Sequence, residues 1–254
     1  MSRDCLKDIA EVASFEKEIS GSSDFLMEEK PSFSGSSSLN EIRIENKEAE
    51  AVQNINVEKQ PEDWMSISNL DDLRSCIASC KKCPLAATRK NFVFGEGNPN
   101  ADILVIGEGP GAEEDNQGKP FVGRSGQLLT KILEAIQLSR DDVFIANIVK
   151  CRPPLNRRPE TGEIDSCEPY LKKQIELIKP AFILALGLTA IDTLLKKSHR
   201  MADIRGHLLS YCGITTMATY HPAALLRNPN LKKDTWEDVK KLQSIYRDYL
   251  NNNK

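Results

Sequence analysis

DILVIGEGPGAEED (102–115) joins a short apolar run directly to a glycine-rich loop. The run at 102–108 has the length and aliphatic content of a buried strand. Two similar runs follow, VFIANIVK (143–150) and AFILALG (181–187), with helical patterns between them. Strands that alternate with helices predict one α/β domain with a mostly parallel central sheet. We expect three layers, with helices on both faces of that sheet.

Helical patterns fill the intervals around these strands. Apolar residues recur at helical spacing over 67–77, just before the CKKC turn at 80–83. Further helices are predicted at 125–136, 160–178, 189–196 and 233–250. A weaker pair of strands around 207–219 precedes the predicted loop YHPAALLRNP at 220–229.

The first 66 residues differ in composition from the rest of the 254-residue chain. They hold 15 acidic and 7 basic residues, a balance of −8, which leaves 22 acidic and 27 basic residues, a balance of +5, for 67–254. Ser-, Glu- and Asn-rich sequence with few large apolar residues is typical of disorder. We therefore predict a disordered acidic tail at 1–66 and a domain at 67–254, with order beginning near Trp64. The mildly basic domain permits a polyanionic partner.

The start of the tail carries a helical pattern of its own. Its apolar positions are Leu6, Ile9, Val12, Phe15 and Ile19. This segment either docks an unknown protein or forms a transient helix in a solvated tail, and we favour the second interpretation.

The sequence has no features of a membrane or secreted protein. It contains no run of 18 apolar residues, and MSRDCLKDIAEV (1–12) lacks the apolar core of a secretory signal. Seven cysteines, an odd number, favour a reducing compartment with metal-bound or free thiols over disulfides. We expect a cytoplasmic monomer without membrane contact.

Four of the cysteines form a pattern typical of a soft-metal site. Cys80 and Cys83 are a close pair, whereas Cys151 and Cys167 are single residues far along the chain. Thiolates select zinc or iron–sulfur clusters over cations that prefer oxygen ligands. Because the ligands come from three segments, a metal here would clamp those segments together. The residues alone leave zinc and iron–sulfur both open.

Polar and glycine-rich segments gather at the carboxyl ends of the predicted strands. GEGPG (107–111) follows the first strand, Asn147 lies near the end of the second, and His221 follows the strand pair. Parallel sheets bind their ligands at this edge. An amide both donates and accepts hydrogen bonds, so Asn147 suits the polar edge of a pyrimidine base. The alternative is that these residues only stabilise turns. Phe121, in a loop of Gly, Pro and Arg, is expected to be available for stacking.

Four segments carry a resemblance to a known family. They are CKKCPLAATR (80–89), GEGPGAEEDNQGKPFVGRSGQLL (107–129), NIVKCRPPLNRRP (147–159) and TYHPAALLRNP (219–229). In this order they resemble the family 4 uracil-DNA glycosylases, the iron–sulfur members of the uracil-DNA glycosylase superfamily. The resemblance spans residues 70 to 250. It implies a monofunctional DNA repair hydrolase that flips uracil out of single- or double-stranded DNA and cleaves its N-glycosidic bond, leaving an abasic site.

The same resemblance implies a cofactor and a substrate pocket. The ligands of a [4Fe–4S] cluster, with zinc as the alternative, would be Cys80, Cys83, Cys151 and Cys167. Phe121 matches the aromatic that stacks on the extruded uracil, and Asn147 matches the side chain that reads its polar edge. His221 matches the histidine placed near uracil O2.

The water-activating residue is less well defined by the resemblance. Gly109 occupies the place where the superfamily's best-known branch has an aspartate that assists water attack, and it lies in the motif that faces the reacting sugar. Glu108 is therefore our first candidate for activating water, and Glu114, which borders the pocket, is the second.

Several residues are candidates for contacts with DNA. Ser125, at the start of a predicted helix, is expected to hold a flanking phosphate together with free helix amides. Leu225, Leu226 and Arg227 are placed to wedge into the gap left by the flipped base. Helix packing is the alternative for the leucines, and we favour it for at least one of them. The arginines of CRPPLNRRP (151–159) are candidates for phosphate contacts, with a solvated loop as the equal alternative.

Two other interpretations stay open. Cys76, Cys80 and Cys83 form the C-x3-C-x2-C motif of radical-SAM enzymes, but the large barrel that those enzymes need is not predicted. We expect Cys76 to be a buried thiol instead. The second is a non-catalytic DNA-binding module, because glycosylase-like domains are fused to some phage-type DNA polymerases. The presence of Glu108, Asn147 and His221 together favours an enzyme.

Overall fold

The computed structural model describes residues 63–253. The predicted tail therefore lies almost wholly outside the described residues, and the helical pattern at its start lies wholly outside them. Residues 63–66, which the prediction assigned to the tail, form a 3-10 helix, η1 (Asp63–Ser66). Trp64 is 7% exposed there and meets Tyr170 edge to face, with ring centroids 4.9 Å apart. The packed domain thus includes residues before position 67.

The domain is built on one six-stranded sheet with the order β1-β3-β2-β4-β6-β5. The strands are β1 (Glu96–Gly97), β2 (Ile103–Gly107), β3 (Val143–Asn147), β4 (Phe182–Leu186), β5 (Leu208–Tyr211) and β6 (Ile214–Thr219). The four central strands are parallel, and the two edge strands pair antiparallel to them. This confirms the mostly parallel sheet. The short edge strand β1 was not predicted.

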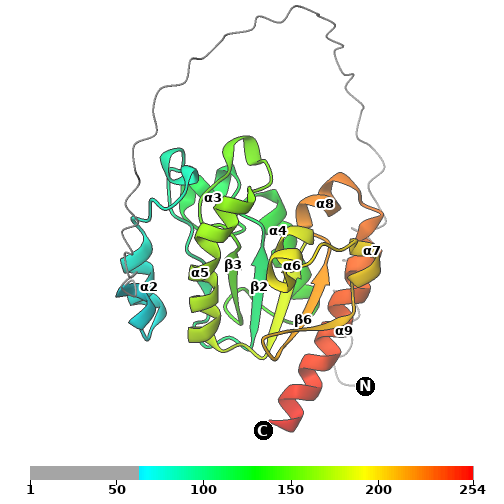
Figure 1. The fold of residues 1–254 in the computed structure, drawn as a ribbon. Helices are drawn as coiled ribbons and strands as arrows, with labels where there is room; N and C mark the ends of the chain where they lie inside the picture. Colours follow the sequence, from blue (N-terminus) through cyan, green and yellow to red (C-terminus); the bar gives the residue numbers. More distant parts are fainter. Residues whose placement is uncertain (1–62, 254) are drawn as a thin grey trace, which may run out of the picture.

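Helices cover both faces of the sheet, which confirms the three-layer α/β prediction (Figure 1). Alternate strand residues point to opposite faces, so Leu104 and Ile106 lie in one core cluster and Ile103 and Val105 in another. The first cluster packs against α2 (Leu70–Ile77), α5 (Thr161–Ile178) and α6 (Leu188–Leu195). The second packs against α4 (Arg124–Ala135) and α9 (Leu231–Asn252).

Two short helices lie where loops were predicted. α3 (Ala112–Gln117) begins inside the glycine-rich loop, and α8 (Pro222–Arg227) lies inside YHPAALLRNP. Both are six residues long and depend on side-chain caps. The Glu114 carboxylate caps the start of α3, and the His221 ring caps the start of α8. The prediction of loops at these two places was wrong.

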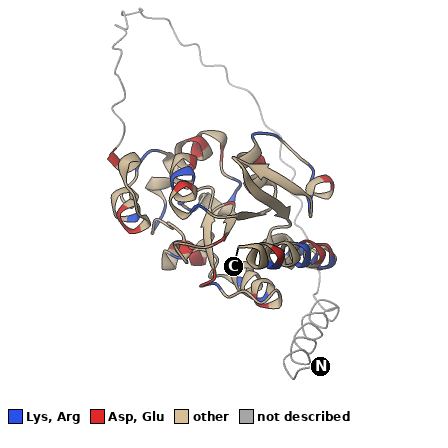
Figure 2. Ribbon diagram, turned by 90° about the horizontal axis from the view of Figure 1, so that it is seen from below, with Lys and Arg blue, Asp and Glu red and all other residues tan. Residues whose placement is uncertain are grey.

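The remaining short elements connect the main layers. They are the 3-10 helices η2 (Pro84–Ala87) and η3 (Pro154–Asn156) and the helix α7 (Met201–Ile204). Within residues 63–253, no helix has the length and apolar character needed to cross a membrane. Figure 2 shows acidic and basic residues along the helix that ends at the C mark, α9, which faces solvent on its outer side.

Candidate active site

A cavity of about 710 Å³ lies at the carboxyl ends of the parallel strands. Most of the predicted site residues line it, namely Glu108, Gly109, Glu114, Phe121, Ser125, Asn147, His221 and Arg227. They come from the segment after β2, the end of β3, the first turns of α3 and α4 and the loop between these helices, and the two ends of α8. The predicted convergence of these segments at one sheet edge is therefore confirmed.

The floor of the cavity is formed where β2 and β3 end. Gly107 and Asn147 are partners across the ladder. A Cβ atom on Gly107 would lie 2.5 Å from Asn147 Oδ1 and 2.5 Å from Phe121 Cζ, so only glycine allows both side chains to lie here. Asn147 is 2% exposed, and its Oδ1 has no hydrogen-bond partner within residues 63–253. A buried amide oxygen without a partner is rare, and it marks a place for a hydrogen-bond donor from a ligand.

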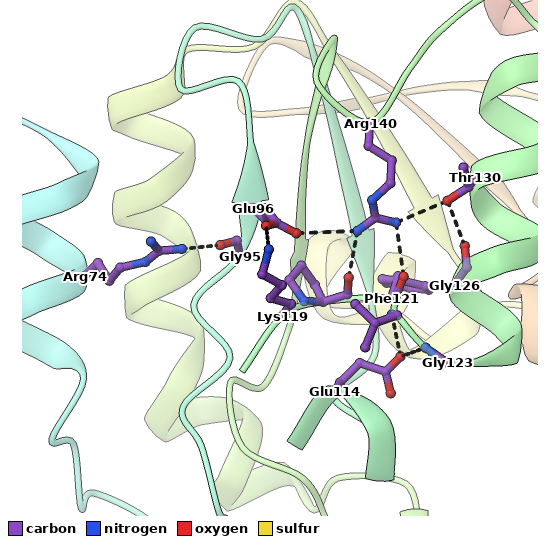
Figure 3. A network of polar contacts seen from close by, with 12 residues as sticks. Arg74, Gly95, Glu96, Glu114, Lys119, Phe121, Gly123, Gly126, Thr130 and Arg140 are labelled. Carbon is purple, nitrogen blue, oxygen red and sulfur yellow. Dashed lines mark hydrogen bonds and ion pairs between the residues drawn. The ribbon is translucent and has the colours of Figure 1, made fainter. Parts of the chain in front are cut away.

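Phe121 is held against this floor by a strained but well-supported loop (Figure 3). Its φ of 51° lies in the left-handed region. Arg140 donates hydrogen bonds to the carbonyl oxygens of Pro120 (2.8 Å) and Phe121 (3.1 Å). At Gly126 in α4, a Cβ atom would lie 1.9 Å from the Phe121 carbonyl oxygen. Helix and loop can therefore approach this closely only because position 126 is glycine.

Glu114 supports the same loop from the other side. Its Oε1 accepts hydrogen bonds from the backbone N–H groups of Val122 and Gly123, both at 2.8 Å, and its Oε2 accepts one from Gly111 at 3.1 Å. Three backbone donors thus converge on a carboxylate that is 8% exposed. This arrangement suits a group that positions Phe121 better than one that activates water.

We expect Glu114→Ala to lower the free energy of unfolding by about 2–4 kcal/mol, because three backbone N–H groups lose a charged acceptor. For a domain of this size this corresponds to a fall in Tm of roughly 5–15 °C. Thermal unfolding followed by circular dichroism measures it, with Glu113→Ala as the control, since the neighbouring Glu113 is exposed. A variant that keeps its Tm but loses kcat would instead make Glu114 the water-activating group.

Glu108 follows β2 directly and faces the cavity. Thr189, in the first turn of α6, donates a hydrogen bond from Oγ1 to Glu108 Oε2 at 2.5 Å. Backbone bonds from Ile148 to the Gly107 carbonyl (2.9 Å) and from Val149 to the Glu108 carbonyl (3.1 Å) extend the β2–β3 ladder beyond the strands. The carboxylate is therefore fixed in direction, with Oε1 left to contact a ligand or a water molecule.

The His221 ring is neutral at physiological pH. Burial, together with the nearby positive charge of Arg227, lowers its pKa to about 4, against a smaller opposing effect of Glu114. His221 Nδ1 accepts a hydrogen bond from the Ala223 N–H at 3.1 Å. The single ring proton must then lie on Nε2, so the ring offers a hydrogen-bond donor. Its centroid lies 5.5 Å from that of the Phe121 ring.

Of the residues predicted to contact DNA, three are accessible and one is buried in the core. Ser125 and Arg227 line the cavity, and Leu226 is 40% exposed. Leu225 is 1% exposed and packs with Ile132, Ile136, Trp236 and Val239. The prediction that Leu225 wedges into DNA is therefore wrong, because this side chain is part of the core. Helix packing, the alternative expected for at least one of the leucines, is what the structure shows for Leu225.

The four predicted metal-binding cysteines lie in or against the first core cluster. All are free thiols; Cys151 and Cys167 are buried, with Cys80 and Cys83 packed against the same core cluster. Burial, with smaller contributions from the neighbouring Cys151 and Cys83, raises the pKa of Cys167 to about 12, against the opposing effect of Lys150. These effects on the pKa values indicate that sulfur atoms from three separate segments of the chain lie near one another.

Hydrogen-bond donors surround the sulfur atoms. Arg89 Nη1 lies 3.0 Å from Cys151 Sγ, the Tyr170 hydroxyl 3.3 Å from Cys80 Sγ, and the Lys150 backbone N–H 3.3 Å from Cys167 Sγ. Such donors stabilise thiolates and the sulfur ligands of clusters. No group of three or more His, Cys, Asp or Glu side chains in the described part of the chain is arranged to hold a metal ion.

Lys150 connects the cysteines to the cavity floor. It is 0% exposed, and its Nζ donates hydrogen bonds to the Asn147 carbonyl oxygen (2.9 Å) and to Gln174 Oε1 (2.6 Å). Burial lowers its pKa to about 8, and the nearby Cys167 and Cys151 oppose this shift. The segment from Asn147 to Cys151 thus links the cysteines directly to the floor of the cavity. Cys76, by contrast, is exposed, so the prediction of a buried thiol there was wrong.

Sequence analysis did not single out some residues that line the cavity. Thr189 fixes Glu108, and Tyr220 and Asn156 belong to the wall. Thr189 follows β4 at its carboxyl end, so the strand-end rule that pointed to Asn147 could have found it. Asn156 lies in the basic loop, where only the arginines drew attention.

Comparison with known proteins gives a consistent result. A family model described as the Uracil DNA glycosylase superfamily matches residues 94–240, more than half of the chain. A type-4 uracil-DNA glycosylase of Saccharolobus solfataricus is 46% identical over 186 residues, covering 70% of this chain and 86% of that protein.

This chain can be compared with two relatives from one organism, Pyrobaculum aerophilum, which belong to different types of uracil-DNA glycosylase. Its type-4 uracil-DNA glycosylase is 44% identical over 179 residues, covering 67% of this chain and 91% of that protein. Its type-5 enzyme is 30% identical over 188 residues, covering 61% of this chain and 83% of that protein. The chain therefore belongs to the uracil DNA glycosylase superfamily and, within it, to the type-4 uracil-DNA glycosylases.

Proposed function

We propose that this protein is a DNA repair hydrolase that removes uracil from DNA and leaves an abasic site. The observation that carries the proposal is the buried Asn147 amide, whose Oδ1 has no partner within residues 63–253 and lies beside the Phe121 ring. A planar base with a polar edge fits between these two groups, with its face on the ring and its edge on the amide.

The amide would select uracil by its hydrogen-bond pattern. Uracil presents an N3–H donor next to the O4 acceptor, and Asn147 can accept from the first through Oδ1 and donate to the second through Nδ2. Cytosine presents the reverse pattern at both positions. The base must leave the duplex to reach this buried group, as in other enzymes that act on single bases.

Bond cleavage leaves positive charge on the sugar and negative charge on uracil. We assign Glu108, facing the cavity with Oε1 available, to stabilise the sugar cation and to orient water. We assign the neutral His221 to donate from Nε2–H to uracil O2 as charge develops there. A Cβ atom at Gly109 would lie 2.7 Å from Val149 Cγ2, so glycine lets this segment lie close to Val149. Glu114 positions the loop of Phe121.

A [4Fe–4S] cluster held by Cys80, Cys83, Cys151 and Cys167 is the cofactor that we propose, with zinc as the alternative. Four free cysteines from three segments, with hydrogen-bond donors to the sulfur atoms of Cys80, Cys151 and Cys167, form a donor set that suits iron–sulfur ligation. The cluster would serve as a structural clamp under the segment that presents Asn147.

Protonation of His221 is expected to leave the catalytic rate of the wild-type enzyme unchanged between pH 8 and about pH 5.5. With a pKa of about 4, roughly 97% of this ring is neutral at pH 5.5, whereas an ordinary histidine would be about 10% neutral. Because the folded-state pKa lies below the unfolded one, folding stability should fall as pH drops from about 6.5 toward 4. Proton NMR of the three histidines, assigned with His221→Gln, measures this pKa. A value near 6.5 would contradict the predicted pH range of the catalytic rate.

Incubation with a uracil-containing oligonucleotide, followed by alkali, tests the proposed function. Strand breaks should appear only after alkali, because no lysine lines the cavity in the described part of the chain and a lyase step would need one. Breaks before alkali would contradict the monofunctional assignment. The remaining proposals are that the enzyme acts as a cytoplasmic monomer on uracil in single- or double-stranded DNA.

A further inference from the structure

Leu155 is the most exposed large apolar side chain among residues 63–253. It is 96% exposed, whereas the next, Leu208, is 51% exposed. A single exposed leucine is common on protein surfaces. Its backbone conformation and its position beside the cavity are what set Leu155 apart.

The backbone at Leu155 is also unusual. Its φ and ψ are 54° and 22°, in the left-handed region that glycine and asparagine adopt far more easily than leucine. Asn156 follows with a φ of 55°. Strained conformations of this kind persist only when surrounding contacts fix them, and they gather at functional sites.

Those surrounding contacts are strong in this loop. Arg157 forms a paired hydrogen bond with the Glu163 carboxylate, at 2.8 and 2.6 Å, and the Glu163 side chain is only 3% exposed. Arg152 Nε donates to Asn156 Oδ1 at 2.8 Å. The tip that carries Leu155 is therefore rigid, and its side chain is held away from the protein.

The loop stands at the mouth of the cavity. Pro153, Asn156, Arg157 and Arg158 belong to the cavity wall, as does Arg227 of α8. Figure 1 shows α8 and the segment that precedes α5 at the same end of the sheet. Exposed Leu226 lies on α8 next to Arg227, so apolar and basic side chains border the cavity on both elements.

We propose that Leu155 inserts into the base stack of duplex DNA beside the nucleotide that has been flipped into the cavity. This inference rests on the proposed function. Apolar side chains on rigid loops can fill the space that an extruded base leaves, and neighbouring arginines can hold the flanking phosphates. Leu155 and Leu226 would then approach the duplex from two elements.

The test compares Leu155→Ala and Leu155→Gly with wild type on uracil in duplex DNA and on the same uracil in a single strand. Both variants should lose about 10-fold or more in kcat/KM on the duplex and less than about 2-fold on the single strand, because only the duplex closes its stack when the wedge is absent. Leu155→Gly should have a Tm equal to or above that of wild type, since glycine adopts this φ freely. Loss of activity could then not be attributed to misfolding.

Fluorescence of 2-aminopurine placed next to the uracil reports unstacking directly, and the variants should show a smaller increase on binding duplex. Leu208→Ala is the matched control, because Leu208 is exposed on β5 and does not line the cavity. The wedge would be overturned if Leu155→Ala cleaved duplex DNA as fast as the unmutated protein does, or if the variants lost equal activity on both substrates. It would also be overturned if the unmutated protein acted on single strands alone. Absence of wild-type activity on both substrates would overturn the proposed function itself.

Discussion

Asn147→Ala is expected to lower kcat/KM for uracil excision by about 100- to 1,000-fold, comparable with the loss of a buried donor that acts on developing charge. The variant removes both hydrogen bonds to the polar edge of the base and leaves that edge buried without partners. Multiple-turnover kinetics on a uracil-containing duplex measures the effect.

The same variant should fold normally, because within residues 63–253 Asn147 Oδ1 accepts no hydrogen bond whose loss would destabilise the protein. Asn100→Ala is the matched control, since Asn100 is exposed at the opposite end of β2. If Asn147→Ala lost less than about fivefold in activity, the amide would not be the group that reads the base.

Cys167→Ser is expected to produce the largest change in stability. Cys167 is 6% exposed and lies in the core beside Cys151, so a missing ligand would remove the clamp between three segments of the chain. We expect loss of broad absorption near 400 nm and a fall in Tm of more than about 10 °C, which corresponds to several kcal/mol in a domain of this size.

Cys212→Ser is the control for this experiment, because Cys212 is an exposed free thiol. It should keep the absorption, the Tm and the activity of wild type. A wild-type protein that is colourless and contains zinc would contradict the cluster, and a Cys167→Ser variant with unchanged Tm would contradict the clamp.

The central strands and their convergence could be predicted from the sequence because they depend on local apolar runs. Residues 103–107, 143–147 and 182–186 lie in such runs, and parallel strands necessarily bring their carboxyl ends to one edge. The two six-residue helices could not be predicted in this way. Their caps are the side chains of Glu114 and His221, residues whose chemistry drew attention to catalysis and away from helix capping.

The burial of Leu225 and the exposure of Leu226 could not be predicted either, because α8 was predicted to be a loop. In a loop Leu225 and Leu226 are equivalent candidates, but in α8 they are about 100° apart around the helix axis, so one is buried and the other exposed. The exposure of Leu155 was not predicted for a related reason. Its exposure follows from a left-handed backbone fixed by the Arg157–Glu163 pair, and that contact spans six residues.

The central claim is that the cavity at the carboxyl ends of the parallel strands excises uracil and selects it over cytosine by the Asn147 amide. The most direct measurement is mass-spectrometric detection of the free base released from oligonucleotides that differ only in carrying uracil or cytosine at one position. The account predicts free uracil from the first, release reduced by about 100-fold or more in Asn147→Ala, and no base from the second. No free uracil from wild-type protein, or cytosine released as readily as uracil, would contradict it.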